Sequence, residues 1–280
     1  MWTSSNEFIR IALAEDIGHG DITSSLTIGE ETASADIIAK EAFILAGMPF
    51  VSEVFDIVDA DLSIDIFFTE GTVVKKGDII ARISGRAKSL LAGERVALNI
   101  LQHLSGIAST AGAFVEKVKV LPVRIVDTRK TKPGMRVMEK YAVTMGGASN
   151  HRFGLYDGVL IKDNHIEIAG GVKTAIGRAR KAHHLLKIEV EVKDMAELMD
   201  ALDAEADVIM LDNMSVDEMK KAVKTIRTRD KKVVIEASGN VNLQNVRDIA
   251  ETGVDIISVG AITHSARAVD ISMKIKRGTH

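Results

Sequence analysis

Residues 127–166 read DTRKTKPGMRVMEKYAVTMGGASNHRFGLYDGVLIKDNHI, and the expected fold and chemistry are inferred mainly from this segment. The apolar runs 123–126 and 158–161 beside and within it have the length of short buried strands. Taken singly, each basic residue would more often be a solvated surface charge. Clustered at strand ends, they predict a pocket for anions, because Arg suits bidentate capture of carboxylate or phosphate. The basic residues are Arg129, Lys130, Lys132, Arg136, Lys140, His151, Arg152 and Lys162.

Downstream, apolar strands alternate with stretches of helical period, as in repeated βα units. Short strands that are buried on both faces belong to parallel sheets, and right-handed crossovers can close such a sheet into a barrel. Helices are expected at 195–202, 216–226 and 243–252. The expected strands are 123–126, 159–161, 188–192, 208–211, 233–235 and 256–259.

Polar residues follow the strands, and in α/β barrels the carboxyl ends of the strands hold the chemistry. Glu191 and Asp212 are candidate ligands of Mg²⁺, which prefers carboxylate and phosphate oxygens. Salt bridges from these carboxylates to Lys162 or Lys193 are an equally weighted alternative. The last two strand ends, at Ser238-Gly239 and Gly260-Ala261, are where barrels often bind phosphate.

The first part of the chain has a different pattern. A short amphipathic helix is expected at 8–16, followed by β-type runs between residues 33 and 83 that indicate a small antiparallel sheet. Gly71 and Gly77 read as turn glycines; a carrier domain modified at Lys75 or Lys76 is the weaker alternative. The period at 89–109 predicts a helix that continues toward Val118 and joins two domains.

The composition sets limits on function. The 280 residues are 46% hydrophobic, with a mean hydropathy of +0.11, which supports a sizeable core. The net charge of −3 argues against general nucleic-acid binding. The absence of cysteine excludes disulfides, thiolate metal sites and cysteine nucleophiles. With no signal-like start and no long apolar run, we expect a cytoplasmic protein without a membrane or nucleic-acid partner.

Several long motifs make the chain similar to the quinolinate phosphoribosyltransferase family. In chain order, they are GDITS, AGERVALNILQHLSGIA, TRKTKPGMRVMEKYAV, GGASNHRFGLYDGVLIKDNHI, EVEV, MLDN, EASGN and SVGAITHS. The resemblance implies an α/β protein of the type II phosphoribosyltransferase fold, with an N-terminal α/β sandwich domain and a partly open α/β barrel. We expect the sandwich domain and interdomain helix at 1–110, the barrel at 111–265, and a C-terminal helix at 266–280 that packs back on the N-terminal domain.

The resemblance also implies an activity and its residues. Family members join quinolinate to phosphoribosyl pyrophosphate, with Mg²⁺, and release pyrophosphate and carbon dioxide to give nicotinate mononucleotide for NAD synthesis. It implies a homodimer or higher oligomer with shared active sites, in which Arg95 enters the partner's site. Quinolinate would be bound by Arg95, Arg129, Lys130, His151, Arg152 and Lys162. Phosphoribosyl pyrophosphate would be bound by Glu191, Asp212, Ser238, Gly239, Asn240, Gly260, Ala261 and His264. The expected catalytic residues are Lys130, Lys162, Glu191 and Asp212, the last two also holding the metal.

Two enzymatic alternatives remain at this stage. A molybdenum-associated relative shares the fold and part of the motifs, but the intact 127–130 and 162–165 segments favour the quinolinate enzyme. Lys162 at a strand end could also be the nucleophile of a Schiff-base aldolase. The density of surrounding cations fits anion binding better than Schiff-base chemistry.

Overall fold

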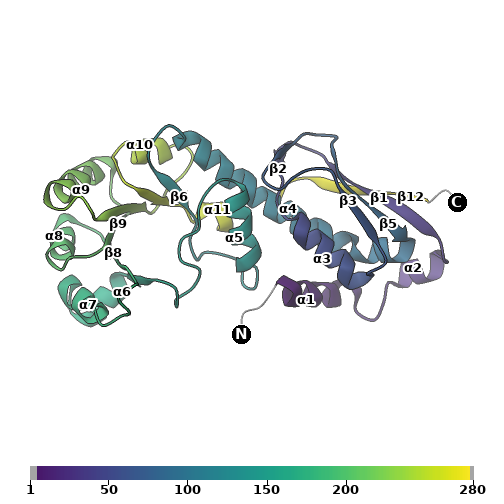
Figure 1. Cartoon of the computed structure of the whole chain (residues 1–280), viewed down its shortest axis with the longest axis horizontal. Coiled ribbons are helices and arrows are strands. Elements are labelled where there is room, and N and C mark those ends of the chain that lie inside the picture. The colour runs from purple at the N-terminus through teal and green to yellow at the C-terminus, as the bar shows by residue number, and fades with distance from the viewer. Residues whose placement is uncertain (1–4, 278–280) are drawn as a thin grey trace. The chain divides into compact units, whose positions relative to one another are not determined.

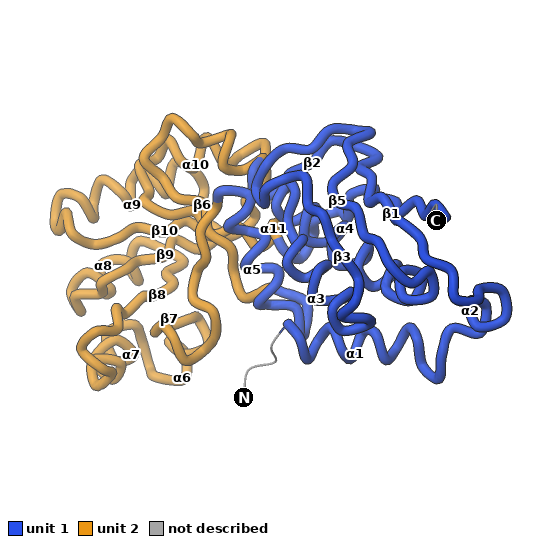
Figure 2. Tube along the Cα trace, turned by 45° about the vertical axis from the view of Figure 1, so that its right-hand side comes forward, with its two compact units in different colours: residues 1–112, 131–147, 263–280 blue, residues 113–130, 148–262 orange. Residues whose placement is uncertain are grey.

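The computed structural model describes residues 5–277, which form two compact units (Figure 2). Unit 1 comprises residues 1–112, 131–147 and 263–280, of which the terminal residues 1–4 and 278–280 are outside the description. Unit 2 comprises residues 113–130 and 148–262. The chain therefore passes between the units several times, and each unit is built from segments that are distant in sequence.

Unit 1 contains an antiparallel sheet of four strands in the order β12-β1-β5-β3. A second, two-stranded sheet pairs β2 with β4. Gly71 and Gly77 have φ values of +79° and +95°, so they serve as turn glycines, as predicted. The strands are β1 (Thr32–Ala39), β2 (Phe43–Ile44), β3 (Ser63–Ile66), β4 (Val73–Val74), β5 (Ile79–Arg86) and β12 (Ile271–Arg277).

The helices of unit 1 include the long helix that the sequence predicts between residues 89 and 118. Its last residues, 113–118, belong to unit 2, and its apolar spacing buries Leu90, Leu101 and Leu104 completely. The helices are α1 (Ser5–Ile17), α2 (Ile22–Thr27), α3 (Met48–Val58), α4 (Ala87–Val118), α5 (Arg136–Met145) and α11 (Ala261–His264), which spans the unit boundary.

The end of the chain corrects one expectation. Residues 266–280 were expected to form a helix, but 271–277 form β12, which pairs with β1 from Ala39↔Ile271 to Ala33↔Arg277 (Figure 1). The reason is the period of the segment: apolar Ile271, Met273 and Ile275 alternate with polar residues, which suits a strand with one face on the core. Residues 278–280 lie outside the described part of the chain.

Helix α3 was also missed within a region that was interpreted as β-type. Val51, Val54 and Phe55 have helical spacing and are fully buried. The first turn contains Pro at a permitted position, and the Glu70 carboxylate accepts the N–H groups of Gly47 and Met48 at 2.7 and 2.9 Å. A distant carboxylate thus supplies the cap that no residue next to the helix provides.

Helix α5 belongs to unit 1, although the expected barrel domain began at residue 111. Tyr141 donates a hydrogen bond to Glu70 at 2.8 Å and packs edge-on against the ring of Phe50. The buried Glu139 carboxylate lies 2.7 Å from His103 Nε2 on α4. These contacts, none of them visible as a sequence period, join α5 to the N-terminal elements.

Unit 2 is built on a parallel sheet of six strands in the order β6-β11-β10-β9-β8-β7. All six predicted strands are confirmed, five of them to within one residue at each end, while β10 ends three residues later than predicted. Among the described residues no pairing joins β6 to β7, so the sheet is open there, as a partly open barrel requires. The strands are β6 (Arg124–Val126), β7 (Val159–Ile161), β8 (Ile188–Val192), β9 (Val208–Asp212), β10 (Val234–Ser238) and β11 (Ile256–Ser258).

Helices follow these strands and cover one side of the sheet (Figure 1). The longest of them, at residues 216–229, buries an apolar stripe that includes Met219, Ala222 and Ile226. None of the described helices has both the length and the apolarity to cross a membrane. The helices are α6 (Asp163–Ala169), α7 (Val172–Ala179), α8 (Met195–Asp203), α9 (Val216–Arg229) and α10 (Val246–Ala250), the last being shorter than the predicted 243–252.

Candidate active site

One face of the unit 2 sheet is polar, and strand register explains why. Paired residues point to the same face of a sheet, and so do residues two apart on a strand. Glu191 pairs with Met210, which pairs with Glu236, while Asp212 pairs with Ser238. The alternation in β8 and β10 therefore places their glutamates on the face opposite Val190 and Ile235, which are completely buried. The carboxylates and Ser238 point to a common side, where the strands end.

Lys162, Glu191 and Asp212 form an electrostatic group at the ends of β7, β8 and β9. Lys162 Nζ lies 3.6 Å from Glu191 Oε2. Burial raises the pKa of Glu191; the negative charges of Asp212 and Asp163 act in the same direction, and the charge of Lys162 opposes them. The salt-bridge interpretation of Glu191 is therefore confirmed by its ion pair with Lys162, and its role as a ligand of Mg²⁺ stays a prediction.

The charges of Arg129 and Arg152 interact. Arg129 follows β6, and Arg152 lies in the loop before β7. Burial lowers the pKa of Arg152, and the charge of Arg129 lowers it further. Arg152 Nη1 donates to the carbonyl of Gly158 at 3.0 Å, which holds the guanidinium group in place. Two neighbouring cations in a half-buried position are stabilised by an anion of matching charge.

The loops after β9 and β10 are joined by side-chain amides. Asn213 Nδ2 donates to Asp212 Oδ2 at 2.8 Å, and Asn240 Nδ2 donates to Asn213 Oδ1 at 3.0 Å. Asn213 N donates to the carbonyl of Ser238 at 2.9 Å. Gly239 has a φ of +94°, and a Cβ there would come within 2.2 Å of Asn213 Oδ1. The close approach of these loops requires glycine at 239.

The remaining expected residues fall into two groups. Lys130 is exposed and follows Arg129 in sequence, Gly260 lies between β11 and α11, and Ala261 is the first residue of α11, all three in unit 2. Arg95 and His264 belong to unit 1. Arg95 lines a cavity of about 320 Å³ together with His103 and Lys132.

His151 and two residues that the sequence analysis did not select form a buried group. His151 Nε2 lies 3.3 Å from Glu189 Oε2 and 3.4 Å from Glu236 Oε2. The side chains of Glu189 and Glu236 are 10% and 1% exposed. A signal was available in the sequence: both glutamates occur at alternate positions in strands that are otherwise apolar, IEVEV and VIEAS. A charge in such a run is costly unless it is paired.

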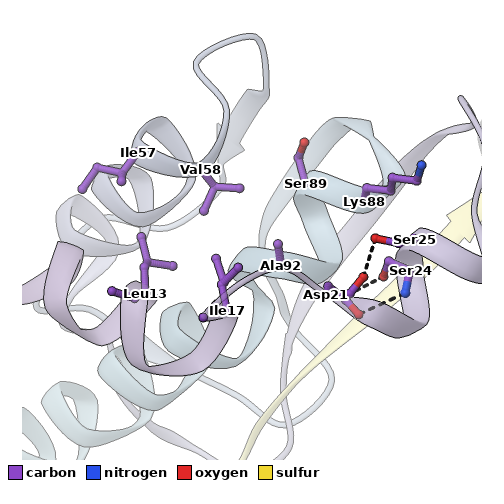
Figure 3. A pocket seen from close by; sticks show the side chains of 12 residues that line it. Leu13, Ile17, Asp21, Ser24, Ser25, Ile57, Val58, Lys88, Ser89 and Ala92 are labelled. Carbon is purple, nitrogen blue, oxygen red and sulfur yellow. Dashed lines mark hydrogen bonds between the residues drawn. The ribbon is translucent and has the colours of Figure 1, made fainter.

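Unit 1 has a cavity of about 500 Å³ that could be taken for a ligand site (Figure 3). Its polar groups already bond to protein groups: Ser24 N and Ser25 Oγ donate to Asp21, and Ser89 Oγ donates to Asp59. Lys88 is the one cation among its lining residues. It lacks the several cations that a dicarboxylate would need, which are present at the strand ends of unit 2.

Comparison with known proteins identifies the family of the chain. Residues 21–105 match the quinolinate phosphoribosyl transferase N-terminal domain, and residues 107–274 match its C-terminal domain. A probable nicotinate-nucleotide pyrophosphorylase [carboxylating] of Bacillus subtilis is 44% identical over 93% of this chain and 90% of its own length. One of Synechocystis is 42% identical over 99% and 94%. The solved structure of the Francisella tularensis nicotinate-nucleotide pyrophosphorylase superposes with a TM-score of 0.92 at 40% identity, over 97% of this chain and 96% of that one. The chain belongs to the quinolinate phosphoribosyltransferase family.

Proposed function

We propose that quinolinate and phosphoribosyl pyrophosphate react at the strand ends of unit 2, with the residues described there in specific roles. The activity itself follows from the family: the chain is a nicotinate-nucleotide diphosphorylase (carboxylating) of NAD biosynthesis. The observation that carries the assignment of the site is a pair of arginines at the strand ends: Arg152 is held by the carbonyl of Gly158, just before β7, and the charge of Arg129, after β6, acts on it. Quinolinate has two adjacent carboxylates, which would occupy this pair together with Lys130 and Lys162.

Phosphoribosyl pyrophosphate would lie on the neighbouring strand ends. The loops at Ser238, Gly239 and Asn240 and at Gly260 and Ala261 would receive its phosphate groups, and the resemblance adds His264 to these ligands. The donor set of Glu191 and Asp212 fits Mg²⁺, because both side chains offer carboxylate oxygens at the ends of adjacent strands, and this ion prefers carboxylate and phosphate oxygens. Bound there, the ion would supply positive charge to the departing pyrophosphate.

The reaction requires no nucleophilic side chain of the protein. The pyridine nitrogen attacks the ribose carbon that loses pyrophosphate, and the carbon gains oxocarbenium character that Glu191 and Asp212 would favour electrostatically. The glycosylated ring is then cationic and accepts the electron pair left when the adjacent carboxylate departs as carbon dioxide. A proton then adds to the ring carbon that has lost its carboxylate. Lys130, Lys162 and the two arginines would hold the retained carboxylate, so that binding favours the transition state for the other's loss.

The site assignment is tested by cation variants in a two-substrate assay. Nicotinate mononucleotide and carbon dioxide are followed with quinolinate, and nicotinate replaces quinolinate as the control acid. We expect the unmodified protein to use quinolinate alone, and Arg129→Ala to raise the quinolinate KM with little change in the KM for phosphoribosyl pyrophosphate. Equal loss of affinity for both substrates would contradict the division of the site. The proposal includes a cytoplasmic location, which cell fractionation checks.

The proposal also includes a homodimer, or a higher oligomer, in which Arg95 completes the site of a second copy. Its support is the resemblance together with the distribution of residues: Arg95 belongs to unit 1, whereas Arg129 and Arg152 belong to unit 2. Mixing Arg95→Ala protein with Arg152→Ala protein should restore part of the activity, because some mixed dimers would contain one intact site. No recovery after verified subunit exchange would refute the shared site.

A further inference from the structure

The ring of His151 is enclosed by protein hydrogen-bonding groups at both nitrogens. Nδ1 accepts the backbone N–H of Arg152 at 2.8 Å. Nε2 faces the two buried carboxylates, 3.3 Å from Glu189 and 3.4 Å from Glu236. Imidazole has only these two polar atoms. A substrate carboxylate would therefore have to displace a protein partner to bond with this ring.

The same trio has the composition of a metal site, since one ligand atom from each residue lies within 4.8 Å of the others. The hydrogen bond at Nδ1 argues against that use. A metal at Nε2 needs the lone pair there, so the ring proton would have to sit on Nδ1, where it would face the Arg152 N–H. With the lone pair on Nδ1, the proton lies on Nε2 and points at the carboxylates.

The trio holds one proton that can lie on the ring or on a carboxyl group. Burial lowers the pKa of His151, but its interactions with Glu189 and Glu236 outweigh burial and raise the pKa to about 10, while burial also raises the pKa of Glu189. A protonated ring between two carboxylates and a neutral ring beside one protonated carboxyl group contain the same number of protons. The Arg152 N–H favours the second arrangement, because it needs a lone pair on Nδ1. In both arrangements the two ring nitrogens face protein groups.

What this ring holds in place is the segment that presents Arg152. His151 N donates to Oδ1 of Asp127, which is completely buried, at 2.8 Å. The Arg152 N–H donates to the His151 ring, and the N–H groups of Phe153 and Gly154 donate to the Asp157 carboxylate at 2.7 and 3.2 Å. Four consecutive backbone donors thus have side-chain acceptors. A backbone fixed in this way gives the Arg152 guanidinium a defined direction.

We propose that His151 is a positioning residue, anchored by Glu189 and Glu236, that fixes Arg152 for anion binding and does not itself bind a quinolinate carboxylate. This inference rests on the proposed function and changes one part of it, because the resemblance placed His151 among the quinolinate ligands. It also gives a role to two buried glutamates that otherwise have none. Their Oε1 atoms have no hydrogen-bond partner in the described structure, so the histidine is what stabilises them in the sheet interior.

The test compares two variants of Glu236. Glu236→Gln keeps an oxygen that can accept the Nε2 proton, whereas Glu236→Leu removes one of the two acceptors and leaves only Glu189 to hold the ring. We expect Leu to raise the quinolinate KM about tenfold, the size of one lost hydrogen bond to a charged group, and Gln to restore most of the affinity. The KM for phosphoribosyl pyrophosphate should stay within about twofold of the unmodified value in both. If Gln raises the KM as much as Leu, or if neither changes it, the anchor is refuted.

A second measurement does not depend on how the Leu variant folds. In protein labelled with ¹⁵N-histidine, the signals lost in His151→Asn identify this ring, and ¹⁵N NMR distinguishes protonated from lone-pair nitrogens. We expect the same state of both nitrogens before and after saturation with quinolinate. A change in protonation of either nitrogen on binding would overturn the inference. Failure of the unmodified protein to turn over quinolinate would instead count against the proposed function, so the two failures are distinct.

Discussion

Gly239→Ala should damage both stability and substrate binding, because two separate costs meet at this position. Gly239 has a φ of +94°, and its Cβ would lie 2.2 Å from Asn213 Oδ1 and 2.9 Å from Asn213 N. The left-handed backbone costs about 1–2 kcal/mol for an L residue. The clash adds about 1–3 kcal/mol, as overpacking does elsewhere. We therefore expect a loss of about 2–5 kcal/mol in the free energy of unfolding, less if the Asn213 side chain moves.

Gly77→Ala provides the matched control. Its φ of +95° is almost the same, but nothing lies within 4 Å of the added Cβ. Thermal unfolding of the two variants isolates the clash, and KM values for phosphoribosyl pyrophosphate show whether the Asn213–Asn240 contact positions the phosphate loop. Gly239→Ala should melt below Gly77→Ala and alone raise that KM. If the two variants melt together and both keep the KM, the reasoning about this loop is refuted.

Three further predictions follow from other parts of the molecule. Arg152→Lys should raise the quinolinate KM tenfold or more in steady-state assays, because lysine retains the charge but cannot bond a carboxylate in bidentate fashion, and an unchanged KM would refute direct binding. Asp59, 4% exposed in its side chain, has its pKa lowered by hydrogen bonds from Arg86 and Ser89. Asp59→Asn should therefore lower the melting temperature at pH 7. The difference from the unmodified protein should shrink as the pH falls below 3.8, the ordinary pKa of aspartate, because a carboxyl group with a depressed pKa stabilises the fold only while it is ionised. A difference that stays constant across pH would contradict this. Removing residues 271–280 should destabilise unit 1 and promote association, because it exposes the edge of β1, and a truncated protein that melts normally would show that β12 is dispensable.

Much of this fold could be predicted because its periods are local. The six strands of unit 2 are short apolar runs, and the three helices predicted after β8, β9 and β10 have apolar stripes of the expected spacing. The carboxyl ends of parallel strands meet at one edge, so the placement of Glu191, Asp212 and Ser238 followed from position alone. The same argument could have found Glu189 and Glu236. Glu189 lies two residues before Glu191, and Glu236 two residues before Ser238, so each shares a face of the sheet with a residue that was selected.

The features that were missed depend on contacts between distant residues. The cap of α3 comes from Glu70, and the membership of α5 in unit 1 depends on Tyr141 and Glu139. No local pattern contains either contact. The strand β12 is different, since its alternation was visible in the sequence, and the expectation of a C-terminal helix there was an error of interpretation.

The roles of His151 and Arg152 illustrate a limit of assignment by resemblance. Both are polar residues of one loop, and both were grouped as ligands of quinolinate. The hydrogen bonds separate them: the histidine ring is occupied by protein groups, whereas the arginine is fixed beside a second arginine. Burial and partners, which sequence cannot supply, decide which of two adjacent residues can contact a substrate.

The most direct test of the account is a crystal structure of the protein with quinolinate bound. The account predicts carboxylate oxygens within hydrogen-bonding distance, about 2.7–3.2 Å, of the guanidinium groups of Arg129 and Arg152, with neither ring nitrogen of His151 bonded to the ligand. Quinolinate bound away from these arginines, for example in the cavity of unit 1, would contradict the central claim.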